Sequence, residues 1–188
     1  MQQNANSKKA VLLDGAVGTS LWEKTAHKVD VWRYNIENPG IVQELHGEYL
    51  EAGAQIILAN TFGAKRTNVC RSEYTVEQIV STALRLARET IGDRAKIALS
   101  IGPLSGLLEP YGDISEEYAF AAYDEQISCG VESGADLIFI QTFTDLAMAK
   151  IAATAARKHM LPMLCSFSFD QHGRTMMGNS VEQIIREM

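Results

Sequence analysis

Polar residues and glycines suited to holding a small ligand stand where the short apolar runs of this chain end. They are Asp14, Gly15, Asn60, Thr61, Gln141, Thr142 and Ser166. Acid and amide oxygens accept hydrogen bonds from an ammonium, while amide and backbone N–H groups donate to a carboxylate. Small-molecule pockets need only a few such groups, placed among apolar ones. We therefore predict that this set forms the binding site of a small zwitterionic substrate.

The same set contains no nucleophile and no strong general base. It holds no His, no Lys that could form a Schiff base, and no Ser–His–Asp arrangement. The cysteines Cys70, Cys129 and Cys165 are far apart in the sequence and predict neither a disulfide framework nor a metal site. Cys165 lies inside an apolar run and is interpreted as a small buried hydrophobic residue. We therefore assign substrate-binding residues and no catalytic or metal-binding residue.

The stretch around Asp14 is the most informative of these positions. Val11–Leu13 is apolar and runs directly into Asp14 and Gly15. This pattern predicts a buried strand that stops abruptly and exposes one carboxylate, with glycine providing the backbone freedom for a tight exit. A plain strand-to-helix turn in which Asp14 caps the helix is the alternative interpretation.

The elements that must position these residues alternate along the chain. Near-continuous apolar runs predict strands at Val11–Leu13, Ile56–Ala59, Ile97–Ile101, Leu137–Ile140 and Met163–Phe167. Such runs are typical of parallel strands covered on both faces. Segments of helical period lie between them, and two begin with capping-box patterns at Thr75 and Ser180. Strand–helix repetition predicts an α/β fold with a parallel sheet and right-handed crossovers.

An internal sequence similarity favours a (β/α)8 barrel over other α/β folds. Residues 52–62 resemble residues 133–143, an offset of 81 residues that spans two strand–helix units. Alternate strands of such a barrel contribute to the same interior layers, so a similarity that recurs after two strand–helix units is consistent with this fold. A doubly wound open sheet is the alternative. That fold usually has a G-x-G-x-x-G loop after its first strand, and residues 15–18 lack this spacing.

Composition excludes several classes of partner. The net charge is −6 and there is no basic run, so we expect no nucleic-acid partner. No apolar stretch reaches membrane-span length, so we expect no membrane association. Residues 1–9 are polar and lack a hydrophobic signal-peptide core, which predicts a disordered tail on a cytoplasmic protein. Residues 10–188 are expected to form one folded unit.

Taken in order, the motifs resemble the homocysteine S-methyltransferase family, the barrel of betaine–homocysteine methyltransferase and of the N-terminal module of cobalamin-dependent methionine synthase. The resemblance covers Val11 to the end. It rests on Asp14-Gly15-Ala16-Val17-Gly18-Thr19, His46 with Tyr49 and Ala52-Gly53-Ala54, Asn60-Thr61-Phe62, Gly102-Pro103, Tyr111-Gly112-Asp113, Gly134-Ala135-Asp136 with Gln141-Thr142, and Gly173-Arg174-Thr175 with Gly178.

This resemblance implies transfer of a methyl group to the sulfur of homocysteine or a related thiol, which gives methionine. Family members hold zinc through cysteine thiolates, and the zinc removes the proton that an ordinary thiol keeps at neutral pH. Asp14 would hold the amino-acid end of homocysteine. The position of Gln141 is commonly Glu in relatives, where it contacts the amino group. No motif identifies the methyl donor, whether of corrinoid, folate or betaine type, and a corrinoid protein is one conceivable partner.

Length separates this chain from those relatives. About five strand–helix units are expected here, whereas the zinc cysteines of relatives follow a sixth strand and stand near an eighth. We therefore expect the N-terminal part of a homocysteine-binding barrel, inactive alone, with its zinc ligands beyond the end of the chain. A non-catalytic barrel fragment that self-associates, or that complements a second chain through its open sheet edges, is the alternative. An unrelated barrel enzyme with a phosphorylated substrate is a third.

Overall fold

The computed structural model describes residues 10–25 and 28–188. The predicted disordered tail at residues 1–9 lies outside this described part. The strands are β1 (Ile56–Leu58), β2 (Lys96–Ile101), β3 (Leu137–Phe143) and β4 (Met163–Phe167). The helices are α1 (Val17–Lys24), α2 (Tyr34–Glu37), α3 (Pro39–Glu51), α4 (Arg66–Val69), α5 (Val76–Ile91), α6 (Glu116–Glu132), α7 (Leu146–Arg157) and α8 (Val181–Glu187), with a 3-10 turn at Val31–Arg33.

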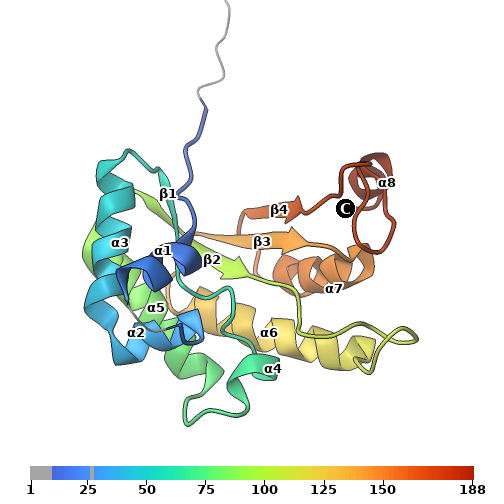
Figure 1. The fold of residues 1–188 in the computed structure, drawn as a ribbon, viewed down its shortest axis with the longest axis horizontal. Coiled ribbons are helices and arrows are strands. Elements are labelled where there is room, and N and C mark those ends of the chain that lie inside the picture. The colour runs from blue at the N-terminus through green and yellow to red at the C-terminus, as the bar shows by residue number, and fades with distance from the viewer. Residues whose placement is uncertain (1–9, 26–27) are drawn as a thin grey trace, which may run out of the picture.

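The strands form one parallel sheet in the order β1-β2-β3-β4. Helices α3, α5, α6 and α7 pack side by side in chain order and contact the sheet on one face (Figure 1). Helix α8 follows β4 at the far end of the sheet. This arrangement confirms the predicted α/β fold with parallel strands. None of the helices within the described part of the chain is long and apolar enough to cross a membrane.

Local sequence signals explain where the main helices begin. The Thr75 side chain accepts a hydrogen bond from the Gln78 backbone N–H, and the Gln78 side chain accepts one from the Thr75 backbone, which completes the predicted capping box of α5. Ser180 caps α8 in the same way through the backbone N–H of Gln183. Each cap satisfies backbone donors that a helix start otherwise leaves unpaired.

The core lies between the sheet and its helices because side chains alternate along each strand. On β2, Ile97, Leu99 and Ile101 are fully buried in the main hydrophobic cluster with residues of α5, α6 and α7. Ala98 belongs to a smaller cluster with Leu58 and Leu137 on the opposite face of the sheet. Ser100 alternates onto that same face, so the second face carries the polar groups near the strand ends.

The predicted buried strand at Val11–Leu13 is wrong in its extent and its burial. Only Leu13 forms a parallel bridge, to Ile56, and it is isolated from the four-stranded sheet. Val11 is 59% exposed and Leu12 is 55% exposed. The physical reason is that this segment runs beside β1 on one side only, so its outer edge has no neighbour among the described residues.

Strand β4 is present where predicted but is not covered on both faces. It pairs only with β3, so it is the other edge of the sheet. Leu164 is 39% exposed, and Cys165 is exposed, so the interpretation of Cys165 as a buried hydrophobic residue is wrong. Partial burial by the surrounding protein still raises the pKa of the Cys165 thiol to about 11. The thiol therefore stays protonated near neutral pH, which makes it a poor nucleophile.

Candidate functional site

A cavity of about 600 Å³ lies at the carboxyl ends of β1, β2 and β3 and beside the start of α1. Ligands of parallel α/β folds bind at this end of the strands. The cavity is lined by Gly15, Ala16, Val17, Gly18, Thr19, Trp22, Asp30, Val31, Trp32, Leu58, Ala59, Asn60, Phe62, Gly63, Asn68, Ser100, Gln141 and Thr142. Of the predicted binding residues, Gly15, Asn60, Gln141 and Thr142 are therefore brought together in one place.

Asp14 precedes Gly15 in the chain and is itself not among the residues that line the cavity, but its carboxyl has an unusual environment. Its Oδ2 accepts a hydrogen bond of 2.8 Å from the backbone N–H of Leu58. Its Oδ1 is buried and has no partner among the described residues. Loss of solvent raises the pKa of Asp14 to about 7, and the hydrogen bond from Leu58 offsets only part of that effect.

Asp14 does not cap the helix that follows. Helix α1 begins at Val17, its N-cap residue is Ala16, and no side chain forms a capping hydrogen bond there. The helix-cap interpretation of Asp14 is therefore wrong. The carboxyl instead accepts from the backbone of β1 with one oxygen, while its other oxygen is buried without a partner among the described residues, which is unfavourable.

Asn60 ties three segments together at the cavity wall. Its Nδ2 donates to the carbonyl of Val31 and to Oδ1 of Asn35, and the Asn35 side chain donates to the carbonyl of Asn60. Both N–H groups of Asn60 are used in this way. The atom that Asn60 can offer to a ligand is therefore its Oδ1, an acceptor.

Thr61 and Ser166 are not among the cavity-lining residues. Thr61 is fully buried, and its hydroxyl donates to the carbonyl of Ser100 and accepts from the Ser100 backbone N–H. It therefore continues the pairing between β1 and β2 beyond the last backbone hydrogen bonds. Ser166 accepts a hydrogen bond of 2.9 Å from the backbone N–H of Thr142. Both residues hydrogen-bond to the backbone of cavity-lining residues, Thr61 to Ser100 and Ser166 to Thr142.

The backbone is irregular where β3 reaches the cavity. The register of β3 against β4 shifts between Ile140 and Phe143, and Thr142 has a φ of 56°. Such irregularities in a strand re-aim the neighbouring side chains. Here the irregular stretch presents Gln141 to the cavity, where its Oε1 accepts a 2.8 Å hydrogen bond from Ser100 Oγ.

Replacing Thr142 by Gly is expected to raise the free energy of unfolding by about 0.5–1 kcal/mol. A β-branched residue at positive φ stores strain of roughly 1–2 kcal/mol, which exceeds the entropic cost of roughly 0.5–1 kcal/mol for introducing glycine. Urea denaturation measures the change. The control is Thr154→Gly in the exposed part of α7, which should lower stability by about 0.5 kcal/mol. A loss of stability in both variants would show that Thr142 is not under backbone strain.

Sequence reasoning missed the aromatic walls of the cavity. Trp22, Trp32 and Phe62 line it, and Trp32 is 3% exposed with its Nε1–H buried and without a partner among the described residues. One sequence signal was available, because both tryptophans of the chain occur in the twenty residues after Asp14. Large aromatic rings in an otherwise polar stretch are equally consistent with the lining of a binding site and with a local hydrophobic core.

Lys65 is a second residue that the sequence did not single out. It is 3% exposed, its Nζ donates to the carbonyl of Pro103, and this ammonium lies 5.4 Å from the centre of the Phe62 ring. Burial lowers the pKa of Lys65 to about 8. A glycine at position 102 allows the same Phe62 ring to lie against the backbone, because a Cβ there would come within 2.8 Å of it. Lys65 thus connects the loops that follow β1 and β2.

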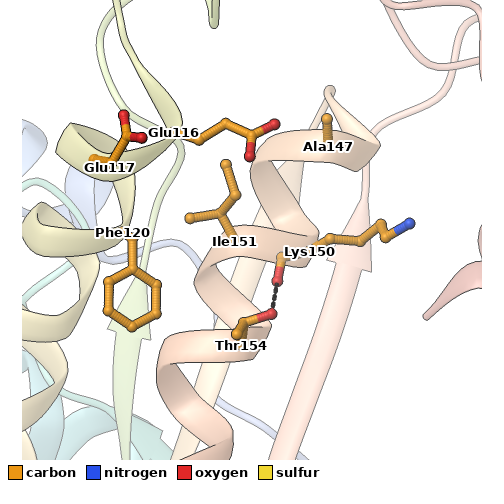
Figure 2. A pocket seen from close by; sticks show the side chains of 7 residues that line it. All are labelled: Glu116, Glu117, Phe120, Ala147, Lys150, Ile151 and Thr154. Carbon is orange, nitrogen blue, oxygen red and sulfur yellow. Dashed lines mark hydrogen bonds between the residues drawn. The ribbon is translucent and has the colours of Figure 1, made fainter.

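A second hollow, of about 570 Å³, lies between α6 and α7 on the outer helical layer. Figure 2 shows Phe120 of α6 and Ile151 of α7 between the two helices, with Glu116 above Ile151 and the Lys150 side chain pointing away from α6. The hydrogen bond drawn there, from Thr154 to the carbonyl of Lys150, is internal to α7. This hollow lies between two helices of the outer layer and shares no lining residue with the cavity at the strand ends, so it is not the candidate site.

The described residues do not fit a zinc site. Within residues 10–25 and 28–188, no three His, Cys, Asp or Glu side chains are grouped closely enough to hold a metal ion. The thiols of Cys70, Cys129 and Cys165 belong to the end of α4, to α6 and to β4. Three protein ligands converging on one point are the minimum for a catalytic zinc, and these thiols do not converge.

Comparison with known proteins gives a consistent family. The model of the homocysteine S-methyltransferase family matches residues 11–188. The crystal structure of the homocysteine methyltransferase MmuM from Escherichia coli in its metallated form is 20% identical, with a TM-score of 0.83 over 96% of this chain and 70% of that chain. Its oxidised form gives a TM-score of 0.81 at 20% identity, covering 94% and 68% of the two chains. The chain therefore belongs to the homocysteine S-methyltransferase family, and its strands and helices form part of that family's (β/α)8 barrel.

Proposed function

We propose that this chain is the homocysteine-binding part of a methyltransferase that moves a methyl group to the sulfur of homocysteine or a related thiol. In that reaction the bond between donor and methyl breaks, a sulfur–methyl bond forms, and the thiol proton is lost. The observation that carries the proposal is the buried, half-unpaired carboxyl of Asp14 beside a cavity at the strand ends. The family match over residues 11–188 supports it.

The residues have distinct tasks in this proposal. Asp14 Oδ1 accepts from the substrate ammonium, and Asn60 Oδ1 offers a second acceptor. Gly15 lines the cavity without a side chain, and position 15 needs glycine because a Cβ there would come within 2.9 Å of the Tyr49 hydroxyl. The exposed aromatic face of Phe62 and the rings of Trp22 and Trp32 are apolar surfaces for the substrate chain and the methyl donor. Among the predicted residues, Thr61 and Ser166 position their neighbours.

Among the described residues that line the cavity, the one ionisable side chain is the exposed carboxyl of Asp30. An ordinary thiol has a pKa of about 8.5 and is mostly protonated near neutral pH. We therefore propose that zinc in the complete enzyme is held by residues that this chain does not contain. The homocysteine methyltransferase MmuM from E. coli has been crystallised in a metallated form, which supports a metal in the family but assigns no ligand here.

The test combines binding, metal content and activity on the purified chain. We expect homocysteine to bind in calorimetry, zinc in elemental analysis to stay well below one ion per chain, and methyl transfer to be undetectable. Zinc and activity should appear together when the missing strands of the barrel are supplied as a separate polypeptide. Stoichiometric zinc that disappears in a Cys165→Ser variant would overturn the metal assignment, and absence of homocysteine binding would overturn the proposed function.

The exposed edges favour association as a second candidate function. Leu12 at one edge is 55% exposed and Leu164 at the other is 39% exposed, and both edges leave backbone groups open to pairing. Sedimentation of the same samples separates the two candidates. A mass above that of one chain without homocysteine binding would support association alone. A cooperative monomer that binds homocysteine would exclude association as the main behaviour.

A further inference from the structure

The hydrogen bond between Ser100 and Gln141 determines which polar groups Gln141 offers to a ligand in the cavity. Ser100 is 2% exposed, and its backbone N–H and carbonyl are both held by the Thr61 hydroxyl. Its own hydroxyl donates to Gln141 Oε1 at 2.8 Å. Ser100 is therefore a rigidly placed donor, aimed at the oxygen of the Gln141 amide.

This hydrogen bond decides which end of the amide a ligand meets. With Oε1 held by Ser100, Gln141 is left with its Nε2, and no hydrogen bond within the described residues uses that group. An amide nitrogen carries two N–H donors and no acceptor. Turning the amide over would place Nε2 against Ser100 and leave a buried hydroxyl without an acceptor, which is unfavourable.

The backbone around Gln141 opposes other rearrangements. The register shift beside β4 and the positive φ of Thr142 set the direction in which Gln141 leaves the strand. The Thr142 backbone N–H is in turn anchored on Ser166 Oγ. Both the main chain and the side-chain oxygen of Gln141 are thus held, and its two N–H groups remain for a ligand.

Asp14 and Gln141 approach the cavity from opposite sides of β1 and β2. Asp14 belongs to the segment beside β1, and Gln141 belongs to β3, so β1 and β2 lie between them. Asp14 presents an unpaired acceptor oxygen, whereas Gln141 presents donors. The Asp14 carboxyl contacts Leu58 on β1 and the Gln141 amide contacts Ser100 on the neighbouring β2, so an acceptor and a donor are held on adjacent strands. An α-amino acid, which carries its ammonium and its carboxylate on one carbon, needs an acceptor and a donor that are close together.

We infer that Ser100 is a positioning residue that makes Gln141 a donor, so that Gln141 recognises a carboxylate or carbonyl oxygen of the thiol substrate and leaves the ammonium to Asp14 and Asn60. This inference rests on the proposed function and specifies its substrate class as thiols with an acceptor group facing β3. A glutamate at position 141 would instead present acceptors on both walls and repel such a group.

Two analogues of homocysteine, each lacking one of its charged groups, test the inference. 4-Sulfanylbutanoate keeps the thiol and carboxylate without the amine, and 3-aminopropane-1-thiol keeps the thiol and amine without the carboxylate. In Gln141→Glu we expect the affinity for 4-sulfanylbutanoate to fall roughly tenfold or more, through charge repulsion in a partly buried place. The affinity for 3-aminopropane-1-thiol should hold or increase. Calorimetry at fixed pH gives both values, and circular dichroism checks the fold.

The variant Ser100→Ala separates positioning from simple structural support. Removing the hydroxyl lets the Gln141 amide turn either way, so the preference for 4-sulfanylbutanoate over 3-aminopropane-1-thiol should shrink severalfold. A purely structural role for Ser100 would weaken both ligands equally and keep the ratio, which would overturn the inference. Homocysteine binding with an unchanged ratio in both variants overturns the inference alone. Absence of binding by all three thiols overturns the inference and the proposed function together.

Discussion

Asp14→Asn is expected to weaken homocysteine binding by roughly 10- to 150-fold, the equivalent of about 1.5–3 kcal/mol for a hydrogen bond to a charged group. The carboxyl has one oxygen on the Leu58 backbone N–H and one buried oxygen that lacks a partner in the described structure. An ammonium seated there gains a charged acceptor, and an asparagine amide cannot provide the charge. Calorimetry with homocysteine measures the loss directly.

The same residue predicts a pH dependence for the native chain. Burial raises the pKa of Asp14 from 3.8 to about 7, so the empty site holds a proton on this carboxyl below neutral pH. An ammonium binds the ionised form, and homocysteine affinity should therefore rise with pH through about 7 and then level off. The Asp14→Asn variant should show a flat profile over the same range.

Asp30→Asn is the matched control, because Asp30 is an exposed acid that lines the candidate cavity. It changes the charge of the region by the same amount without touching the buried carboxyl. We expect less than a threefold change in affinity, as for a solvent-screened charge. Equal weakening in the two variants would indicate a general field effect and would remove Asp14 from direct contact.

Acidification is expected to remove about 3 kcal/mol of unfolding free energy through His46 alone, by the linkage of pKa to stability. His46 lies on α3, is fully buried, and has neither ring nitrogen hydrogen-bonded within the described structure. Burial lowers its pKa from 6.5 to about 4. Between these values the unfolded chain binds the proton more readily than the folded one. The stability contribution is therefore complete above pH 6.5 and is lost as the pH falls towards 4.

Asp14 acts in the opposite direction in the same window. Its pKa is raised in the folded state, so its protonation stabilises the fold as the pH falls from about 7 towards 3.8. The bare pH curve of the native chain therefore mixes two opposing contributions. A comparison between the native chain and a His46 variant cancels the Asp14 contribution, because Asp14 is present in both.

His46→Leu is the appropriate variant, since it fills a similar volume and places no unpaired polar atom in the core. Urea denaturation should show similar stability for the two proteins at pH 7.5. At pH 4 the variant should be more stable than the native chain by about 3 kcal/mol. His172→Leu, at an exposed position, should leave the pH profile unchanged. Parallel profiles for native chain and His46→Leu would contradict a titrating buried histidine.

Much of the fold was predictable because its determinants are local. Strand β4 has the bounds expected from its apolar run, and β2 differs from its expected range by a single residue. The caps at Thr75 and Ser180 stand where the capping-box patterns placed them. Apolar runs, helical periodicity and capping residues act within a few positions of one another. Neighbouring residues are therefore sufficient to predict them.

The place of the site was also predictable, because parallel strands bring their carboxyl ends to one edge. Gly15, Asn60, Gln141 and Thr142 come from three separate parts of the sequence, and they line one cavity. The sequence also contained the whole ordered set of motifs that identifies the family over residues 11–188. Residue types and their order were sufficient for these conclusions.

The orientation of individual side chains required the folded chain. Asn60 and Thr61 are adjacent in sequence, yet one borders the cavity and the other pairs with β2, because successive residues point to opposite sides. The exposure of Val11, Leu12 and Cys165 depends on whether another element lies alongside, which no run of residues specifies. The raised pKa of Asp14 likewise arises from its burial in the folded chain, and the donor role of Gln141 arises from a distant partner, Ser100. Composition and order thus determined the fold family and the edge that carries the site, while burial and hydrogen bonding between distant segments determined its charge and polarity, because solvation and contact exist only in three dimensions.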